Sequence, residues 1–501
     1  MSLNQMSGLE TLKMNKINST TKRTDSGAIT ILIMAFGAIF IILLGGLFGF
    51  VSLQLRQSVE RAAWSEALHI AEAGIDYYNW CLNNEVEGSC AVEKDYYDAN
   101  GNPVGGFSIE VDATISCGET TRRQIISTGW TDAFPDVKRK VSVLYGKMSV
   151  AKYAYILNDN VWIGQDHEIR GPYHSNGGIR MDGDNQSLVS SGQEEWICTS
   201  SFGCGPSSFQ GQGWGLGQCG DPCHLEGKNC FCPGVFTTEN GSEDLFTFPV
   251  PAFDFDGITI DLADMKDVAV SSGVYLPPSA DLDEDGLGYH IKFLNSGNFE
   301  VWIITELSRT EAYSEEEDWH YDYFTISDEY LYNTYAPPSS CSVVFVEDDL
   351  WAEGTVKGKI TVASANLIDT DVDTDVVLPG NIGYTTTNGA DGLALTGERN
   401  VLIGPQSPNN MELRGIFIAQ KGRFGRNHYE NNDKDYLEIN GSIISNGRVG
   451  TQWTSGSQVI SGYRERETYF DANLIYGAPP FVPTLSSEFE MANWEEIPDS
   501  D

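Results

Sequence analysis

The stretch AITILIMAFGAIFIILLGGLFGFVSL, at residues 28–53, decides how the rest of the chain can fold. It has no charged side chain, and roughly 20 apolar residues are enough for one helix to cross a bilayer. The continuation at residues 54–84 contains no proline, and its apolar residues recur at helical spacing. These residues are Trp64, Ala67, Leu68, Ala71, Ile75 and Tyr78. We therefore predict one helix over residues 28–83, transmembrane in its first half and amphipathic in its second half.

Charge is distributed unevenly around this helix. The formal net charge of -40 excludes nucleic acid as an expected partner, because phosphate binding needs clustered Lys and Arg. Residues 1–27, however, form a basic leader. Its charged residues are Lys13, Lys16, Lys22 and Arg23 against Glu10 and Asp25. A basic flank stays in the cytoplasm. We therefore predict a single-pass protein of the cytoplasmic membrane whose acidic remainder is exported. A cleaved secretory signal is the alternative, but the apolar part of such a signal is usually about 7–15 residues long.

All ten cysteines follow the membrane segment, which predicts disulfides in an exported domain. The spacing of Cys81 and Cys90 suits a local disulfide that closes the end of the helix. Zinc is the alternative for the cluster from Cys198 to Cys232, which includes His224, but paired C-x₂-C knuckles are missing. The disulfide candidates are Cys81, Cys90, Cys117, Cys198, Cys204, Cys219, Cys223, Cys230, Cys232 and Cys341.

Strand signals dominate after the helix, so the predicted fold class is α+β and mostly β. The segments GFSIEVDATIS, RRQIISTGW and KRKVSVLYGK alternate or are β-branched, and they predict a small antiparallel sheet packed on the helix. From residue 154 onward, short β segments alternate with Gly, Asn and Asp, and phrases such as VWIG and VLIG recur. Such short strands predict a β-solenoid, like a right-handed β-helix, with a β-sandwich as the alternative.

These patterns divide the chain into six predicted parts. They are a cytoplasmic leader (1–27), the transmembrane and amphipathic helix (28–83), a small β domain (84–150), a β-solenoid-like domain in two pieces (151–195 and 343–480), a Cys-rich inserted region (196–342) and a loosely held acidic tail (481–501).

One acidic loop has the spacing of a calcium site. Asp281, Asp283 and Asp285 alternate before Gly286, which suits a hard cation with oxygen ligands. Lys292 stands where an EF-hand has its closing Glu, so a further ligand would have to come from elsewhere in the fold. The alternative is a solvated acidic turn. Calcium is the one cofactor that the sequence suggests.

No catalytic motif is evident, and we predict that the protein is not an enzyme. The sequence contains no G-x-S-x-G, no H-E-x-x-H and no P-loop. Acidic residues are plentiful, and two carboxylates suffice for glycoside hydrolysis. A surface protein that binds or cleaves carbohydrate is therefore the alternative function, and a static single-pass envelope protein is a second alternative.

The N-terminal region resembles type IV pilin-like proteins. The basic leader ending in Gly27, the apolar helix and the AEAG sequence at residues 71–74 carry the resemblance, together with RQIISTGWT and KRKVSVLY. It covers residues 27–147 and is closest to PilX-type pilus-assembly subunits and K-type minor pseudopilins. The later segment DDLWAEGTVKGKITVAS resembles rungs of bactofilin-like solenoids.

The resemblance implies a processing site and a set of partners. A prepilin peptidase would cut between Gly27 and Ala28, and other pilin-like subunits would contact the helix within the lipid bilayer. The family's glutamate at the fifth residue after the cut is replaced by Leu32, as in K-type tip subunits. This departure favours a minor or tip subunit of a type IV pilus or pseudopilus that acts in assembly, adhesion or contact with a surface ligand.

Overall fold

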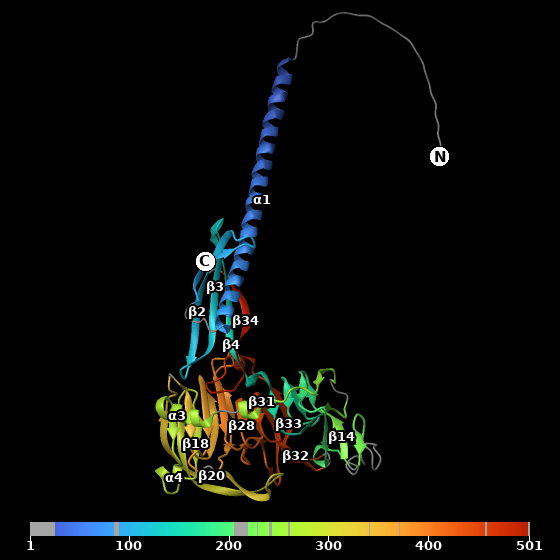
Figure 1. Cartoon of the computed structure of the whole chain (residues 1–501), viewed down its shortest axis with the longest axis vertical. Coiled ribbons are helices and arrows are strands. Elements are labelled where there is room, and N and C mark those ends of the chain that lie inside the picture. Colours follow the sequence, from blue (N-terminus) through green and yellow to red (C-terminus); the bar gives the residue numbers. More distant parts are fainter. Residues whose placement is uncertain are drawn as a thin grey trace, which may run out of the picture.

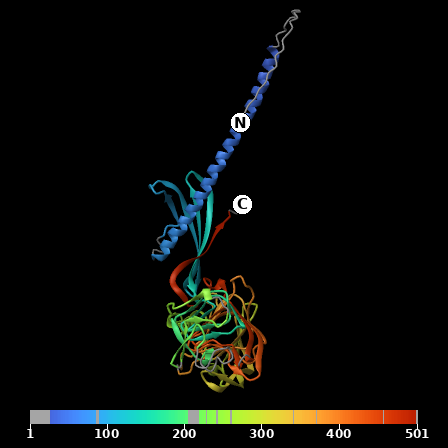
Figure 2. The same cartoon turned by 90° about the vertical axis from the view of Figure 1, so that its right-hand side faces the viewer.

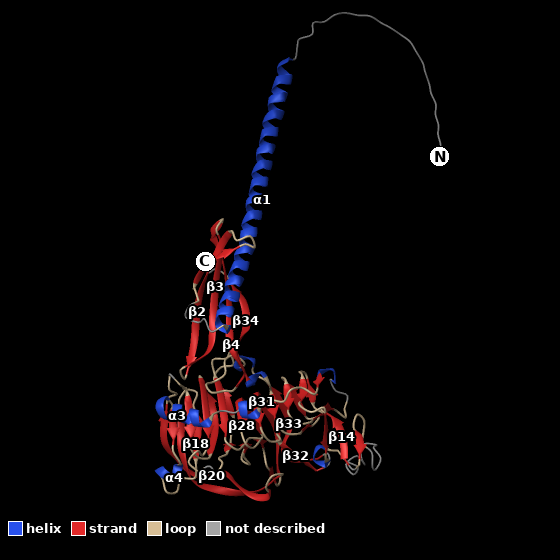
Figure 3. Ribbon diagram, in the orientation of Figure 1, coloured by secondary structure: helices blue, strands red, loops and turns tan. Residues whose placement is uncertain are grey.

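The computed structural model describes residues 26–84, 90–204, 219–227, 229–239, 243–258, 261–339, 341–369, 371–455 and 458–498. The chain forms a long helix, a proximal sheet packed on the lower half of that helix, and a distal β region beyond the sheet (Figures 1 and 2). Strands account for most of the structure after the helix (Figure 3). This confirms the prediction of a long N-terminal helix followed by mostly β structure.

Helix α1 runs without interruption over Ser26–Asn83. The leader predicted at residues 1–27 lies outside the described residues except for its last two positions. The lower half of α1 packs on the sheet through a stripe of mostly small or aliphatic residues, which are fully or almost fully buried. They are Ala63, Ala67, Ile70, Ala71, Ile75 and Tyr78. Trp64, which the sequence placed in this stripe, is instead 53% exposed, and the guanidinium of Arg139 lies 3.1 Å from the centre of its ring.

Five antiparallel strands form the proximal sheet, in the order β1-β2-β3-β4-β34. Their bounds are β1 (Glu93–Tyr97), β2 (Pro103–Ser116), β3 (Glu119–Thr131), β4 (Phe134–Ser149) and β34 (Thr484–Ile497). The prediction of a loosely held tail at residues 481–501 is therefore wrong for most of that segment. Its strand β34 returns from the far end of the chain and pairs antiparallel with β4.

Small residues let α1 lie directly against this sheet. A Cβ atom added to Gly129 would collide with backbone atoms of Ala67 and Ala71, and one added to Gly74 would collide with Ser127 and Phe107. The AEAG sequence thus has a packing role, because the helix backbone at Ala71 and Gly74 lies in close contact with β3 and β2. Ile70, Ile75, Phe107, Ile125 and Val143 form part of the core between them. Each such buried side chain contributes roughly 1.5–3 kcal/mol.

The distal region is built from short strands that stack in parallel ladders. One ladder runs β17-β21-β23-β26-β28-β31-β5-β8-β11-β16. A second runs β18-β22-β24-β27-β29, and a third links β22, β25, β28, β31, β33, β7 and β10. Leu350, Val376, Val401 and Phe424 are successive buried partners along the second ladder. Buried Val, Ile and Leu predominate because both faces of these strands are covered.

The strands of this region are short, and their bounds are as follows: β5 (Tyr155–Leu157), β6 (Val161–Ile163), β7 (His167–Arg170), β8 (Tyr173–Ser175), β9 (Ile179–Met181), β10 (Asp184–Asn185), β11 (Val189–Ser191), β12 (Glu195–Cys198), β13 (His224–Glu226), β14 (Asn229–Pro233), β15 (Val235–Phe236), β16 (Phe246–Thr247), β17 (Val274–Leu276), β18 (Tyr289–Phe293), β19 (Phe299–Ser314), β20 (Asp318–Tyr335), β21 (Val343–Val346), β22 (Leu350–Val356), β23 (Lys359–Ser364), β24 (Val376–Leu378), β25 (Ile382–Tyr384), β26 (Gly392–Gly397), β27 (Val401–Ile403), β28 (Asn410–Ala419), β29 (Phe424–Gly425), β30 (His428–Tyr429), β31 (Asn432–Ser445), β32 (Gln452–Ser455) and β33 (Gln458–Tyr469). The helices are α2 (Phe255–Ile258), α3 (Leu262–Ser272) and α4 (Ser279–Leu282), with 3-10 turns at Val150–Lys152, Ser200–Phe202, Glu243–Leu245 and Ala472–Leu474.

Polar ladders at the turns explain the phrases that recur in the sequence. Asn158 Nδ2 donates to Asn446 Oδ1 (2.8 Å), and Asn176 Nδ2 donates to Asn158 Oδ1 (2.7 Å). The two SNG sequences, at residues 175–177 and 445–447, therefore belong to rungs separated by a single rung. A similar ladder joins Asp349, Asp375 and Asn400 through backbone N–H groups. Burial raises the pKa of the Asp349 carboxyl to about 7.

The chain enters the distal stack in its middle. β5, the first distal strand, pairs with β31, which lies almost at the end of the sequence. From β5 the strands extend to β16, and after α3 the chain resumes at the opposite end of the ladder with β17. The prediction that residues 196–342 form one Cys-rich insertion is therefore wrong, because only part of this interval is separate from the parallel ladders. β15 to β18 pair with strands outside that interval, and β12, β14 and β13 form a separate small sheet.

Two chain crossings and a disulfide join the proximal and distal regions. Ser149 N donates to the carbonyl of Ile475 (2.8 Å), and Val150 N donates to that of Pro483 (3.0 Å). The outgoing and returning segments are thus bonded to each other where they cross. Cys117, at the β2–β3 turn, forms a disulfide with Cys341 of the distal region.

Candidate functional site

The upper half of α1 presents apolar side chains on all sides. The helix is long and apolar enough to cross a membrane by length and composition, with a mean hydropathy of 2.8 in its most apolar window, none of which is buried. Leu32 is 57% exposed, and a Cβ atom on Gly37, Gly45, Gly46 or Gly49 would meet nothing within 4 Å. In Figure 1 this half projects clear of the β structure. It is therefore the surface that lipid or neighbouring helices can cover.

The predicted processing position lies at the start of this helix. Gly27 and Ala28 belong to the first turn of α1, which contains no acidic residue. Leu32, the fifth residue counted from Ala28, lies in the next turn of the same helix. Cleavage between Gly27 and Ala28 stays a prediction.

All ten cysteines are paired in five disulfides. Cys81 pairs with Cys90 and so closes the C-terminal end of α1, as their spacing suggests. Three further disulfides, Cys198–Cys204, Cys219–Cys230 and Cys223–Cys232, hold the small sheet of β12, β14 and β13. Sulfur atoms committed to disulfides are not thiolate ligands, so this pairing favours the disulfide interpretation of the cluster over zinc.

The predicted calcium residues lie at the end of α4 and in the loop that follows it. Asp281 and Asp285 are exposed, whereas both oxygens of Asp283 already accept hydrogen bonds, from Asp285 N (3.1 Å) and Tyr330 Oη (3.0 Å). Among the described residues, one group of three His, Cys, Asp or Glu side chains has all its potential ligand atoms within 4.8 Å of one another. It consists of Cys198, Cys204 and Cys232, whose sulfurs are in disulfides. Calcium at Asp281, Asp283 and Asp285 stays a prediction.

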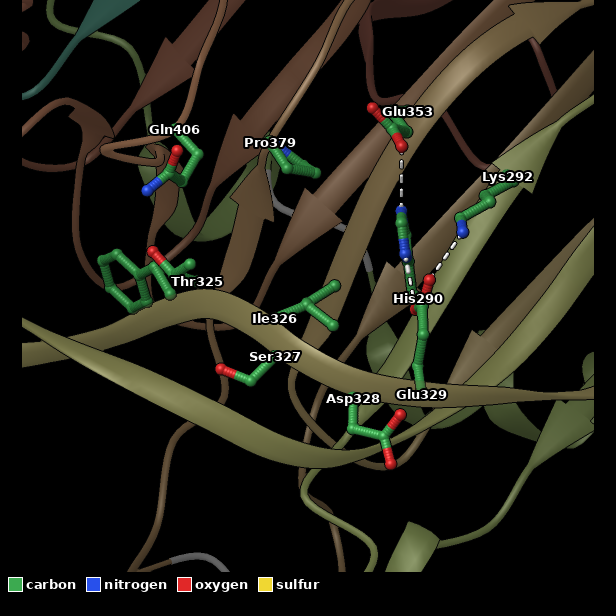
Figure 4. A pocket seen from close by; sticks show the side chains of 11 residues that line it. His290, Lys292, Thr325, Ile326, Ser327, Asp328, Glu329, Glu353, Pro379 and Gln406 are labelled. Atoms are coloured by element: carbon green, nitrogen blue, oxygen red, sulfur yellow. Dashed lines mark hydrogen bonds and ion pairs between the residues drawn. The ribbon is translucent and has the colours of Figure 1, made fainter.

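A polar cleft lies where strand β20 crosses in front of β18 and β22. Its volume is about 470 Å³, and His290 and Lys292 of β18 line it with Glu329 of β20 and Glu353 of β22 (Figure 4). His290 Nδ1 lies 2.8 Å from Glu329 Oε2, and its Nε2 lies 3.4 Å from Glu353 Oε1. Lys292 Nζ donates to Glu329 Oε1 (2.6 Å). One imidazole thus bridges two carboxylates from different strands.

The two carboxylates and the imidazole shift one another's pKa. Burial opposes the charged form of His290, but the hydrogen bond of Nδ1 with Glu329 and the ion pair of Nε2 with Glu353 raise its pKa overall. The interaction with His290 lowers the pKa of Glu353. Burial acts against ionisation of Glu329, yet His290 and Lys292 lower its pKa as well. Both acids are therefore held ionised, which makes neither a good proton donor for glycoside cleavage near neutral pH.

The sequence did not predict this cluster or the long hairpin β19–β20 that covers it. Lys292, which stands where an EF-hand has its closing glutamate, instead pairs with Glu329. Residues 290, 329 and 353 are distant in sequence, so no local pattern marks them. A local pattern does mark one strand of the hairpin, because aromatic and polar residues alternate in WHYDYF at residues 319–324, as in a β-strand.

The sequence matches no family model and no curated protein. Among solved structures, the chain is similar to the competence-associated pilin ComZ from Thermus thermophilus, with a TM-score of 0.29 and 13% identity. The alignment covers 87% of this chain and 97% of that one. At so low a TM-score, the function must be argued from the geometry of this chain alone.

Proposed function

We propose that this protein is a membrane-anchored, pilin-like exported protein that serves as a minor or tip subunit of a type IV pilus or pseudopilus. In this role it is not an enzyme; it acts in assembly, adhesion or surface contact. Its partners are the lipid bilayer, the helices of other pilin-like subunits and a prepilin peptidase.

The observation that carries this proposal is the division of α1 into two halves. The upper half exposes Ile, Leu and Phe side chains around its whole circumference, whereas the lower half buries one stripe against an antiparallel sheet. A static anchor needs only the upper half. The continuous helix fixed on a folded domain is what lateral assembly requires, because helix packing in lipid then sets the position of that domain.

The first turn and the distal region support a minor or tip position. An intramembrane carboxylate is costly unless it is paired, and the first turn of α1 contains none, so no partner is needed there. The distal region is much larger than the proximal sheet (Figure 1). We further propose that its parallel ladders form a β-solenoid, which carries this bulk outward from the cell surface as an adhesive or contact domain.

The decisive experiment is N-terminal sequencing, with intact mass, of the protein purified from its native membranes. We expect a mature chain that starts at Ala28. A matched Gly27→Val variant should keep the leader and fail to assemble, while it remains in the membrane fraction. A wild-type protein that starts at Met1 would instead be a static single-pass envelope protein, and the proposal would be wrong.

A further inference from the structure

Strand β20 presents a row of aromatic side chains to solvent. Trp319, Tyr321 and Tyr323 are 60%, 50% and 53% exposed, and they occupy alternate positions on one face of the strand. Same-face residues on a regular strand are about 6.8 Å apart, a spacing that applies to Trp319 and Tyr321, whereas the pairing of β20 with β19 shifts register beside Tyr323. Large aromatic side chains are usually at least half buried, so three neighbouring rings of this exposure form an aromatic surface that is largely open to solvent.

The opposite face of the same strand is fixed to the distal stack. The carboxylate of Asp322 is 5% exposed and accepts hydrogen bonds from Asn427 Nδ2 (2.8 Å) and Tyr429 Oη (2.8 Å). Trp351 Nε1 donates to the carbonyl of Phe324 (2.8 Å). The inward residues of β20 therefore determine which side chains must point outward.

Ion pairs hold the tip of the hairpin as well. Glu315, Glu316 and Glu317 pair with arginines that follow one another along the stack. Their partners, in the same order, are Arg448 (2.9 Å), Arg423 (3.3 Å) and Arg399 (3.6 Å). A surface fixed in this way loses little conformational entropy when a ligand binds.

The position and charge of the row restrict its partner. β20 lies at the end of the molecule opposite to α1, where a tip subunit would meet its surroundings (Figures 1 and 2). The exposed carboxylates of Glu311 and Asp318 lie on the same hairpin. Glu311 is directly opposite Tyr321, while the guanidinium of Arg309 covers one face of the Tyr321 ring at 4.8 Å. With the net charge of -40, this surface repels polyanions.

From this combination we infer that the outer face of β20 binds a polysaccharide of pyranose units that carries no negative charge. The electron-rich faces of the rings attract the C–H groups of a pyranose face. Neighbouring carboxylates accept hydrogen bonds from its hydroxyl groups or pair with amino groups.

The test is retention of the full-length protein, in a detergent without a sugar headgroup, on insoluble cellulose and on chitosan beads. We expect retention on at least one of these two polymers and none on dextran sulfate beads. The combined variant Trp319→Ala/Tyr321→Ala/Tyr323→Ala should lose retention at least tenfold. Its matched control is Trp494→Ala/Tyr97→Ala, which removes exposed aromatic side chains from the proximal sheet and should bind like the wild type.

Three outcomes would overturn this inference: no retention of the wild type on either polymer, stronger retention on dextran sulfate, or equal retention of the triple and control variants. Thermal unfolding of both variants tests whether they are folded. If the triple variant is unstable, Tyr321→Ala alone should still weaken retention, and unchanged retention would also overturn the inference. This binding goes beyond the proposed function and does not depend on it, because an uncleaved protein would carry the same surface.

Discussion

The proximal and distal regions enclose their cores in different ways. In the proximal region, one stripe of α1 covers one face of an antiparallel sheet, so the core is a single thin layer that includes Ile70, Ile125 and Val143. In the distal region, short strands pair in parallel ladders, and residues of these ladders share one large buried cluster. The first arrangement depends on close contact of a helix with a sheet, and the second on contact between ladders of strands.

This difference also separates what the two regions do in the fold: the proximal layer fixes a domain to a helix, and the distal region extends away from that helix (Figure 1). The proximal core is a cluster of its own, and Cys117 and Leu485 of the proximal region pack at the edge of a distal cluster. We therefore expect two unfolding transitions that can be shifted independently.

The largest expected effect is a cavity in the distal core. Phe417 is fully buried and its ring centre lies 5.7 Å from that of Phe424. Phe417→Ala should destabilise the distal region by about 3–5 kcal/mol. Scanning calorimetry of the full-length protein in detergent should show one transition lowered and the other unchanged.

Ile125→Ala, in the proximal core, is the matched variant and should lower the other transition. If both variants lowered both transitions equally, the two regions would form one cooperative unit, and the comparison above would be wrong.

The second effect concerns the covalent link between the regions. The disulfide Cys117–Cys341 closes a loop with a sequence separation of 224 residues, so its removal increases the conformational entropy of the unfolded chain. Cys117→Ser/Cys341→Ser should cost about 2–4 kcal/mol and make the crossing segments near Ser149 more sensitive to protease.

Its control is Cys198→Ser/Cys204→Ser, which opens a separation of only 6 residues in the Cys-rich sheet. The control should leave the crossing segments resistant. Equal cleavage of the two variants at those segments would show that the interdomain disulfide has no special role there.

The smallest effect is the pH dependence of the clamp at His290, which fastens the hairpin to the distal stack. The pKa of His290 is raised above 6.5, so its contribution to stability is present below that pH and is lost as pH rises through the folded pKa. The pKa values of Glu329 and Glu353 are lowered below 4.5, so their contribution is present above that pH and is lost as pH falls through their folded values. The interaction of His290 with Glu329 and Glu353 is therefore strongest between pH 4.5 and pH 6.5, and Lys292 pairs with Glu329 in the same cluster.

The measurement is the difference in Tm between the wild type and His290→Gln as a function of pH. It should be largest between about pH 5 and 6.5 and shrink toward alkaline pH. His69→Gln, on the exposed face of α1, is the control and should leave the Tm of the distal transition unchanged. A Tm difference for His290→Gln that stays constant from about pH 5 into the alkaline range would contradict the bridging role of the imidazole.

Much of the proximal region could be predicted because its signals are local. The charge-free run at residues 28–53, the helical spacing of Ala67, Ala71 and Ile75, and the three alternating strand segments each specify an element without reference to distant residues. Trp64 was misplaced because helical spacing alone does not show where the sheet ends, and Arg139 covers its ring at the rim.

In the distal region, the presence of many short strands could be predicted, but their arrangement could not. The recurring VWIG, VLIG and SNG phrases indicated stacked short strands, and the asparagine ladder through Asn158 gives them a physical basis. The limits of the Cys-rich insertion were misjudged because strands such as β16 are only two residues long and have no periodicity of their own. Likewise, His290, Glu329 and Glu353 come together only through the ladder and the hairpin.

The sequence by itself determined the long helix, its apolar and amphipathic halves, the antiparallel strands beside it and the oxidised state expected of ten exported cysteines. These follow from composition and periodicity within a few turns of chain. Only the tertiary structure decided that β5 stacks on β31, that the acidic C-terminal segment returns as β34, and that the aromatic row of β20 faces outward. Pairing between distant strands depends on which surfaces remain to be buried once all the others have packed, and no local pattern encodes that choice.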